Sequence, residues 1–277
     1  MRLRMNRAIA GYILAGIAML VMLLYLRFPG ETVTDYVKAM AAVRYPRMLL
    51  SIDTVQPAIP PGVALENVTA CFRGRPEATL HADRLAIGPG WLSLLRGRLA
   101  FLLTAEGYGG EVRGRIEFAN TFSVKGPLSA EMNIREIRIE KCAWLRDALA
   151  RQITGTLKGS ATFSGAAESL KNGTGNIDLT LTNGTYQLLE NILGFERIDF
   201  NKVDAKVSFR NGALKIAGLT LNGEKIRISL KGNILLADDF RESQIDLNGS
   251  IEIPMQGNKR VTLVISGTLG NPKTRFM

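Results

Sequence analysis

The residue types that most often carry catalysis are scarce in this sequence. His81 is its one histidine, and Cys71 and Cys142 are its two cysteines. Catalysis by a Ser-His or Cys-His pair would have to use His81, because the nucleophile needs an adjacent base. His81 lies between Leu80 and Ala82 in a strand-like stretch, where a single histidine is usually structural or solvated. A metal site built from several His and Cys side chains is not expected from so few of them.

The glycine-rich and acidic stretches do not complete a known catalytic motif. Residues 107–110 (Gly-Tyr-Gly-Gly) come nearest to a dinucleotide-binding fingerprint, but Val112 stands where its third glycine is required. Residues 158–160 (Lys-Gly-Ser) have the wrong order for a phosphate-binding Walker loop. Asp238 and Asp239 lie in a polar stretch typical of a turn, and nothing selects a carboxylate pair for hydrolysis. We therefore expect a protein that is not an enzyme, with no catalytic residue, cofactor or metal site.

The charge of the chain is concentrated at its start. Lys and Arg number 35 against 25 Asp and Glu, which gives a net charge of +10. Residues 1–30 hold four arginines and no acid, so the remaining chain carries only a modest excess of +6. A nucleic-acid-binding protein would show a dense basic stripe interleaved with aromatic residues, which is missing here. We expect no nucleic-acid partner.

Residues 8–26 form a run of 19 residues without a charged side chain. As a helix rising ~1.5 Å per residue, this run would cover about 28 Å, close to the ~30 Å hydrocarbon core of a bilayer. Tyr12 and Tyr25 lie near its two ends, where amphipathic rings favour the membrane interface. The pattern predicts a single transmembrane helix that opens the chain.

The charges around this run predict its orientation. Arg2, Arg4 and Arg7 precede it, and only Arg27 follows closely, so the N-terminus is expected in the cytoplasm and the rest on the far side. A cleaved signal peptide is the competing interpretation. Its apolar core would be shorter and would end in a small-residue cleavage site, whereas this run ends in Leu-Tyr-Leu-Arg-Phe-Pro. An uncleaved anchor is favoured.

One amphipathic helix and a proline-rich segment are expected next. Apolar side chains recur at helical spacing between Glu31 and Arg44, and Pro46 ends this pattern. The prolines of residues 57–61 favour an extended crossing.

Two cysteines on the far side of a membrane could form a disulfide, or each could be a small buried residue.

From Gly62 onward apolar residues recur at every second position, which indicates a sheet with one apolar face and one solvated face. Such sheets are normally antiparallel. The clearest alternating sets are Val68, Ala70 and Phe72; Leu99, Phe101 and Leu103; Val203, Ala205, Val207 and Phe209; Ile226, Ile228 and Leu230; and Val261, Leu263 and Ile265.

Turn and helix signals interrupt these strands. Five Asn-Gly pairs, which accept the positive φ angles of tight turns, predict hairpins. They begin at Asn172, Asn183, Asn211, Asn222 and Asn248. Short helices are predicted at residues 91–96, 143–152 and 188–193. These helices either plug an open end of the sheet or are connectors packed on the core.

Several stretches resemble known envelope families. Residues 27–30 (Arg-Phe-Pro-Gly) and 52–63 (Ile-Asp-Thr-Val-Gln-Pro-Ala-Ile-Pro-Pro-Gly-Val) resemble the type II secretion system protein N family. Further stretches are similar to the broader AsmA-like group, namely residues 94–99, 108–114, 155–159 and 266–272. The resemblance covers nearly the whole chain, and the proline-rich stretch is the part that points to the protein N family.

The resemblance implies a single-pass inner-membrane protein with a periplasmic β domain. Its function would be that of an accessory or structural component of the type II protein secretion machinery, in contact with other proteins of that apparatus. The AsmA-like group implies instead a lipid-binding or lipid-transfer protein for outer-membrane homeostasis. There a curled sheet with an apolar groove, or a half-barrel, would hold phospholipid or lipopolysaccharide acyl chains. Neither family implies catalytic residues that map onto this chain.

The expected fold class is mainly β, with a transmembrane helix, a largely antiparallel sheet and a few short helices. The expected organisation is an anchor in residues 1–27, a juxtamembrane helix and proline-rich segment in 28–61, and a β domain in 62–277. Alternation alone leaves open whether the apolar face closes into a barrel, packs in a sandwich or curls around an apolar ligand.

Overall fold

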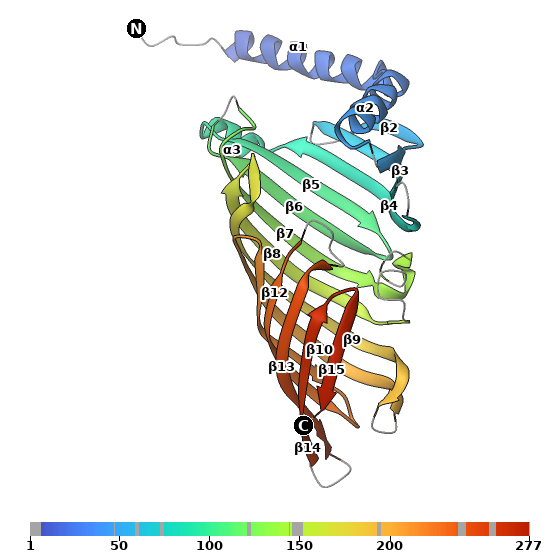
Figure 1. The fold of residues 1–277 in the computed structure, drawn as a ribbon. Coiled ribbons are helices and arrows are strands. Elements are labelled where there is room, and N and C mark those ends of the chain that lie inside the picture. The colour runs from blue at the N-terminus through green and yellow to red at the C-terminus, as the bar shows by residue number, and fades with distance from the viewer. Residues whose placement is uncertain are drawn as a thin grey trace.

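The computed structural model describes residues 7–46, 48–58, 61–72, 75–120, 123–143, 145, 152–192, 195–237, 242–254 and 259–276. Over these residues the chain is mainly β, with one large antiparallel sheet and a few helices (Figure 1). This confirms the predicted fold class at the level of its secondary structure. Residues 238–239, which the sequence places in a turn, lie outside the described residues.

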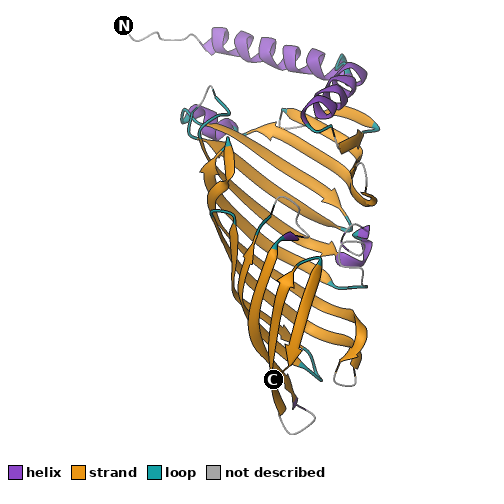
Figure 2. Ribbon diagram, viewed as in Figure 1, coloured by secondary structure: helices purple, strands orange, loops and turns teal. Residues whose placement is uncertain are grey.

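Helices α1, α2 and α3 lie at one end of the sheet (Figure 2). The amphipathic helix predicted between Glu31 and Arg44 is confirmed as α2, and the helix predicted at residues 91–96 is confirmed as α3. The position of α2 beside a membrane stays a prediction. Of the helix predicted at 143–152, only Ala143 and Leu145 are described as helical, and most of it lies outside the described residues. The helical elements are α1 (Arg7–Leu26), α2 (Gly30–Arg44), α3 (Trp91–Leu95) and the 3-10 turn η1 (Ile139–Lys141).

The uncharged run near the N-terminus lies in α1, a helix of 20 residues. Within the part of the chain that the structure describes, no helix meets the combined length and hydropathy of a membrane span. The membrane anchor over residues 8–26 therefore stays a prediction.

From β3 to β15 each strand pairs with its neighbours in the sequence, whereas β1 and β2 both pair with β3. The order across the sheet is β1-β3-β4 and then consecutively to β15, with every pairing antiparallel. The strands are β1 (Met48–Ser51), β2 (Thr54–Ala58), β3 (Gly62–Phe72), β4 (Arg75–Pro89), β5 (Leu99–Gly107), β6 (Gly110–Phe118), β7 (Pro127–Arg138), β8 (Thr156–Ala166), β9 (Ser169–Ile192), β10 (Phe195–Arg210), β11 (Ala213–Asn222), β12 (Arg227–Leu235), β13 (Gln244–Ile253), β14 (Lys259–Thr268) and β15 (Asn271–Phe276).

The sheet is open, because no described strand joins β1 to β15. It curls along its length, and β12 to β15 lie at the end away from α1 (Figure 1). The sheet also begins earlier than the expected boundary at Gly62, since β1 and β2 both pair with β3. Pro57 fits in β2 because that strand pairs on one side only, where the missing N–H of proline is tolerated.

Two of the five Asn-Gly pairs lie at turns. Asn211 and Gly212 have φ angles of 49° and 76° and form the two-residue turn between β10 and β11, as predicted. Asn222 ends β11, and Gly223 follows it in the loop before β12.

The hairpins predicted at Asn172, Asn183 and Asn248 are wrong, because these pairs lie inside the long strands β9 and β13. Gly249 shows the physical reason. A Cβ atom on this residue would collide with the backbone carbonyl of Ser229 in the neighbouring strand. The glycine here permits close approach of two strands rather than a turn.

The helix predicted at residues 188–193 is also wrong where the structure describes it, because β9 continues to Ile192. Its strand pairs with β10, through Gln187 with Arg197 and Ile192 with Phe195. Backbone pairing with a neighbouring strand overrides the helical spacing of the leucines, since local periodicity is a weak signal over so short a stretch.

Replacing Gly212 by alanine should destabilise the fold by about 1–2 kcal/mol, because its φ of 76° is strained for a residue with a Cβ. Chemical unfolding of the full chain measures this. Gly218→Ala is the matched control, because no atom lies within 4 Å of the position that its Cβ would take and its φ is not positive. A control variant that loses as much stability as Gly212→Ala would contradict the turn assignment.

Candidate functional site

One face of the sheet is apolar from β4 to β14. The cross-strand register aligns side chains into rows that run across the strands. One row contains only apolar residues and glycine: Leu85, Ala105, Val112, Ile134, Gly159, Leu179, Ala205, Leu219, Leu230, Gly249 and Leu263. A second row contains Ile87, Leu103, Gly114, Met132, Ala161, Ile177, Val207 and Ile216.

The adjacent row, on the opposite face, is polar. It contains Thr104, Arg113, Asn133, Ser160, Asp178 and Lys206. Because successive side chains of a strand point to opposite faces, these two patterns separate an apolar face from a solvated one. The alternation seen in single strands thus extends into one continuous apolar surface.

The apolar face is covered at one end and accessible at the other. In the C-terminal strands its side chains are buried in two clusters, one around Leu230, Ile251 and Leu263 and the other around Ile216 and Leu247. In the N-terminal half, Ile116 is 37% exposed and Met132 is 42% exposed. A buried apolar core and an accessible apolar surface therefore belong to the same face.

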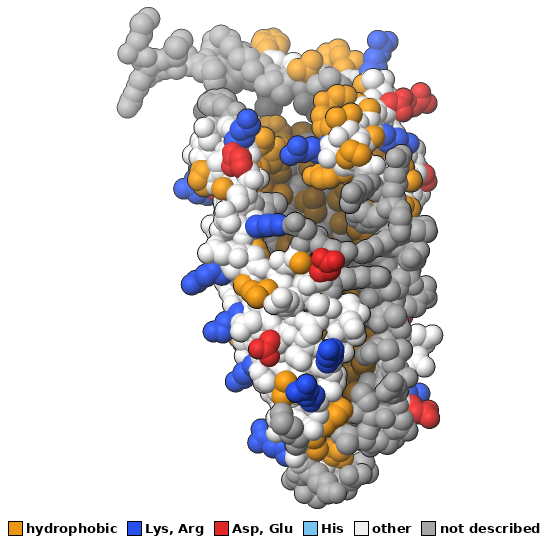
Figure 3. All heavy atoms as spheres, viewed as in Figure 1, with side chains coloured by type: hydrophobic (Ala, Val, Ile, Leu, Met, Phe, Trp, Pro, Cys, Tyr) orange, Lys and Arg blue, Asp and Glu red, His pale blue; other side chains and the backbone are white. Residues whose placement is uncertain are grey.

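A hollow marks the accessible part. Figure 3 shows it below α1, between the lobes that carry α2 and α3, with hydrophobic side chains inside it. A third cluster of buried side chains, around Ile52, Val55, Leu65 and Val68, packs beside α2 at this end. An apolar chain that fills the hollow would remove apolar surface from water. This burial favours binding by about 25 cal/mol for each Å² of apolar surface covered.

Sequence reasoning found parts of this face but not its full extent. The sets at 99–103 and 203–209 do lie on it, as their pairing shows. Between these sets the alternation is less clear, because glycine takes the place of a large apolar residue at Gly114, Gly159 and Gly175. Phe163 and Phe209 flank Gly175, with ring centroids 6.1 Å apart, and cover the space that its missing side chain leaves.

His81 lies on the solvated face, in a ladder of polar side chains. Its Nδ1 lies 3.2 Å from Thr69 Oγ1, and its Nε2 lies 3.2 Å from Asp83 Oδ1. The side chains of His81 and Asp83 are well exposed. These contacts bring a hydroxyl, an imidazole and a carboxylate into line, but on an exposed strand surface rather than in a cleft that would exclude water and orient a substrate.

The motif at residues 107–110 is a hairpin turn between β5 and β6. Tyr108 and Gly109 have φ angles of 54° and 77°. The Tyr108 hydroxyl accepts a 2.7 Å hydrogen bond from the backbone N–H of His81. Burial raises the pKa of Tyr108, and this hydrogen bond partly offsets the shift. Its role is to tie the turn to β4. Residues 158–160 lie inside β8.

The two cysteines are free thiols, which answers the question of a disulfide. Cys71 is half-buried in β3, with its sulfur 3.3 Å from Thr79 Oγ1. Cys142 is buried after η1, and burial, with the charge of Glu140 as a smaller cause, raises its pKa to about 11.

Cys142 should therefore resist alkylation at pH 8 in the folded protein, because only the thiolate reacts. A pKa raised from 9.0 to about 11 leaves about a hundredfold less thiolate, and the rate should rise as the pH approaches the raised value. Iodoacetamide labelling of a Cys71→Ser variant, followed by mass spectrometry, isolates this thiol. Denaturant should restore the rate, and equal labelling with and without denaturant would contradict the burial of Cys142.

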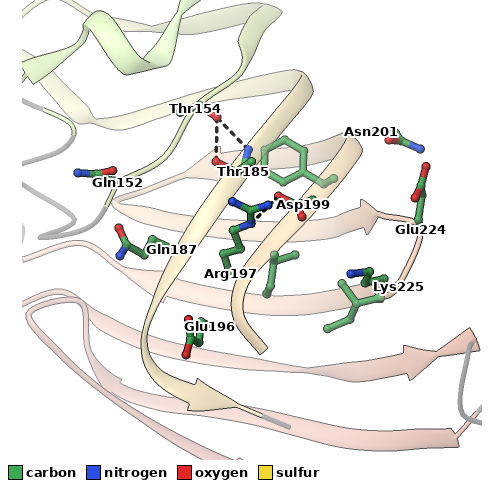
Figure 4. A pocket seen from close by; sticks show the side chains of 13 residues that line it. Gln152, Thr154, Thr185, Gln187, Glu196, Arg197, Asp199, Asn201, Glu224 and Lys225 are labelled. Atoms are coloured by element: carbon green, nitrogen blue, oxygen red, sulfur yellow. Dashed lines mark hydrogen bonds and ion pairs between the residues drawn. The ribbon is translucent and has the colours of Figure 1, made fainter. Parts of the chain in front are cut away.

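An open pocket of about 830 Å³ lies beside the β9–β10 hairpin and is lined mostly by polar side chains (Figure 4). Thr154 Oγ1 lies 3.1 Å from Thr185 Oγ1, and Arg197 Nε lies 3.4 Å from Asp199 Oδ1. The remaining labelled side chains, among them Gln152, are spread around the cavity and do not converge on one point. Both members of the ion pair are well exposed, which is typical of a solvated surface.

Among the described residues, no group of three or more His, Cys, Asp or Glu side chains could hold a metal ion. Comparisons with protein families, curated proteins and solved structures found no match to this chain. The apolar face is accordingly the candidate functional site.

Proposed function

We propose that this protein binds lipid, with acyl chains held against the accessible part of the apolar face. The observation that carries the proposal is the unbroken apolar register from β4 to β14, combined with the exposure of Ile116 and Met132 on that face. An extended hydrocarbon chain matches such a surface because it offers apolar area without polar groups that would need partners.

The location that suits this function is the inner membrane of a bacterial envelope, with the sheet in the periplasm. The uncharged run of residues 8–26 and the arginines before it support this location and orientation. In this arrangement the anchor holds the sheet beside a lipid source, and bound phospholipid or lipopolysaccharide chains serve outer-membrane homeostasis without a chemical reaction.

Purification of the full chain in a mild detergent, followed by mass spectrometry of extracted lipid, tests the proposal. We expect lipid to remain in stoichiometric amounts after extensive washing. A preparation without lipid that also fails to take up a fluorescent fatty acid would overturn lipid binding.

An accessory role in the type II protein secretion machinery is the second candidate. The resemblance at residues 52–63 favours it, and so does the free edge of the sheet. Among the described strands β15 pairs only with β14, and all of its residues are exposed. Such an edge can accept a strand from a partner protein, although Lys273 and Arg275 restrict which strands can pair there.

Deletion of the gene, followed by an assay of secreted exoproteins, tests the second candidate. Secretion should fall in the deletion strain and return with the wild-type gene. Unchanged secretion would remove this candidate and leave the lipid proposal standing.

A further inference from the structure

The short helix α3 exposes its apolar side chains and buries its polar one. Trp91, Leu92 and Leu95 are 49%, 72% and 85% exposed, whereas Ser93 is buried. A helix on the surface of a protein in water normally shows the opposite pattern. Exposed apolar patches of this kind mark a surface that contacts a membrane or another protein.

The sheet holds α3 in this orientation. Ser93 Oγ accepts a hydrogen bond of 2.6 Å from Arg115 Nη2 of β6, and the Ser93 carbonyl accepts one of 2.9 Å from the backbone N–H of Arg98. The backbone N–H of Gly90 donates to the Ala100 carbonyl at 2.8 Å. These bonds fix the polar side of α3 to β5 and β6, so its apolar side faces outward.

The helices α1 and α2 lie at the same end of the sheet (Figure 2), and both expose apolar side chains. In α1, the described side chains Met19, Leu20 and Leu26 are exposed. In α2, exposed apolar side chains recur at helical spacing, at Tyr36, Met40 and Val43. The three helices therefore concentrate uncovered apolar side chains at one end of the molecule.

Basic residues accompany these surfaces. Arg96 and Arg98 directly follow α3, Arg27 follows α1, and Arg44 ends α2. Arg98 also pairs with Glu117 at 3.0 Å, so part of its charge is already compensated within the protein. A tryptophan beside leucines, with arginines at the rim, matches the interface of an anionic bilayer, where indole rings lie at headgroup depth and cations meet lipid phosphates.

We propose that α3 is a second membrane contact, in which Trp91, Leu92 and Leu95 enter the interface of an anionic bilayer beside α1. The end of the sheet that carries the three helices then rests on lipid. Ile87, near the end of β4 and close to Trp91 in the chain, begins the accessible part of the apolar face. This inference goes beyond lipid binding on the sheet, because it assigns the surface through which the protein meets the membrane.

Fluorescence of Trp91 in nanodiscs tests the contact. The full chain with Trp144→Phe keeps Trp91 as its one tryptophan. The nanodiscs contain phosphatidylethanolamine and phosphatidylglycerol, with or without bromine on the upper part of the acyl chains. We expect the brominated lipid to quench Trp91 several-fold and the emission to shift to shorter wavelength. The difference between wild type and Trp91→Phe gives the same signal without a change at Trp144.

The matched control carries Trp91→Phe, Trp144→Phe and Phe276→Trp. Phe276 is 42% exposed and lies next to the C-terminus, which Figure 1 marks at the end away from α1. Its tryptophan should not be quenched. Quenching of Trp91 no greater than in this control would overturn the contact, including the case in which a protein covers α3. Lipid that co-purifies with the same variant in detergent, measured before it is placed in nanodiscs, separates the two proposals, since retained lipid with unquenched Trp91 removes only the contact.

Discussion

Replacing Ile251 by alanine should lower the free energy of unfolding by about 2–5 kcal/mol. Ile251 is 4% exposed and lies in the buried cluster with Ile198, Leu230 and Leu263. Leu230, Ile251 and Leu263 come from the adjacent strands β12, β13 and β14, and Ile198 of β10 joins them, so the cluster ties the C-terminal strands to β10. The smaller side chain leaves a cavity that the surrounding strands can fill only in part. Urea unfolding of the full chain in detergent measures the change.

The neighbouring Glu252 provides the matched control for this prediction. It lies on the same strand but on the opposite face, half-exposed, with Arg260 Nε 3.5 Å from its carboxylate. Exposed ion pairs contribute little, so Glu252→Ala should cost less than about 1 kcal/mol. Equal losses in the two variants would mean that the C-terminal strands are not closed around an apolar core.

A glutamate in place of Met132 should reduce the lipid retained by the purified protein by about tenfold or more. Met132 lies in an apolar row between Gly114 and Ala161 and is 42% exposed, so the variant can fold with its carboxylate in water. A bound lipid would have to cover that charge, and removing a carboxylate from water costs several kcal/mol of binding free energy. A loss of ~1.4 kcal/mol already weakens the affinity tenfold. Mass spectrometry of co-purified lipid measures the loss.

Asn133→Glu is the matched control for Met132→Glu. It adds the same charge at the next residue of β7, which lies on the solvated face and not on the apolar face. Its lipid content should equal that of the wild type. If both variants lose lipid to the same extent, the effect is one of net charge and the apolar face does not bind the chains. Expression of Met132→Glu in the deletion strain also shows whether secretion depends on bound lipid.

Much of the fold follows from local signals. The period of two in residues 203–209 predicts a strand with one apolar side, and β10 pairs with β9 and β11 so that Ala205 and Val207 lie in the apolar rows. The apolar period between Glu31 and Arg44 is long enough to establish a helix, and α2 follows it closely. These predictions succeed because the alternation of side chains along a strand or helix is a property of the backbone alone.

Local signals fail where one strand must fit against another. Between Ile134 and Ile137 of β7, and between Ile216 and Leu219 of β11, the register shifts. The shifts are β-bulges, and they return the next apolar residue to the same face. A strict period of two breaks at these points, so the sequence pattern looks interrupted although the apolar face continues.

The candidate site illustrates the same division. No single strand contains it, since each contributes only a few positions to rows that cross the sheet from β4 to β14. Glycines such as Gly159 belong to those rows because a Cβ would meet Leu179 of the neighbouring strand, and this requirement is visible only once the strands are paired. His81, the residue that chemistry would select first, has no special place in the arrangement.

By itself the sequence determined that the chain opens with an uncharged helix-forming run and continues as strands with one apolar side. It also determined which residues alternate, because side-chain hydrophobicity and backbone period are encoded locally. Only the tertiary structure decided that the sheet stays open, that its apolar rows join into one face, and that this face is buried at β11 to β14 and accessible at β4 to β7. Those features depend on pairing and curvature among strands distant in the sequence, and no local pattern specifies how far a sheet curls before its apolar side chains meet.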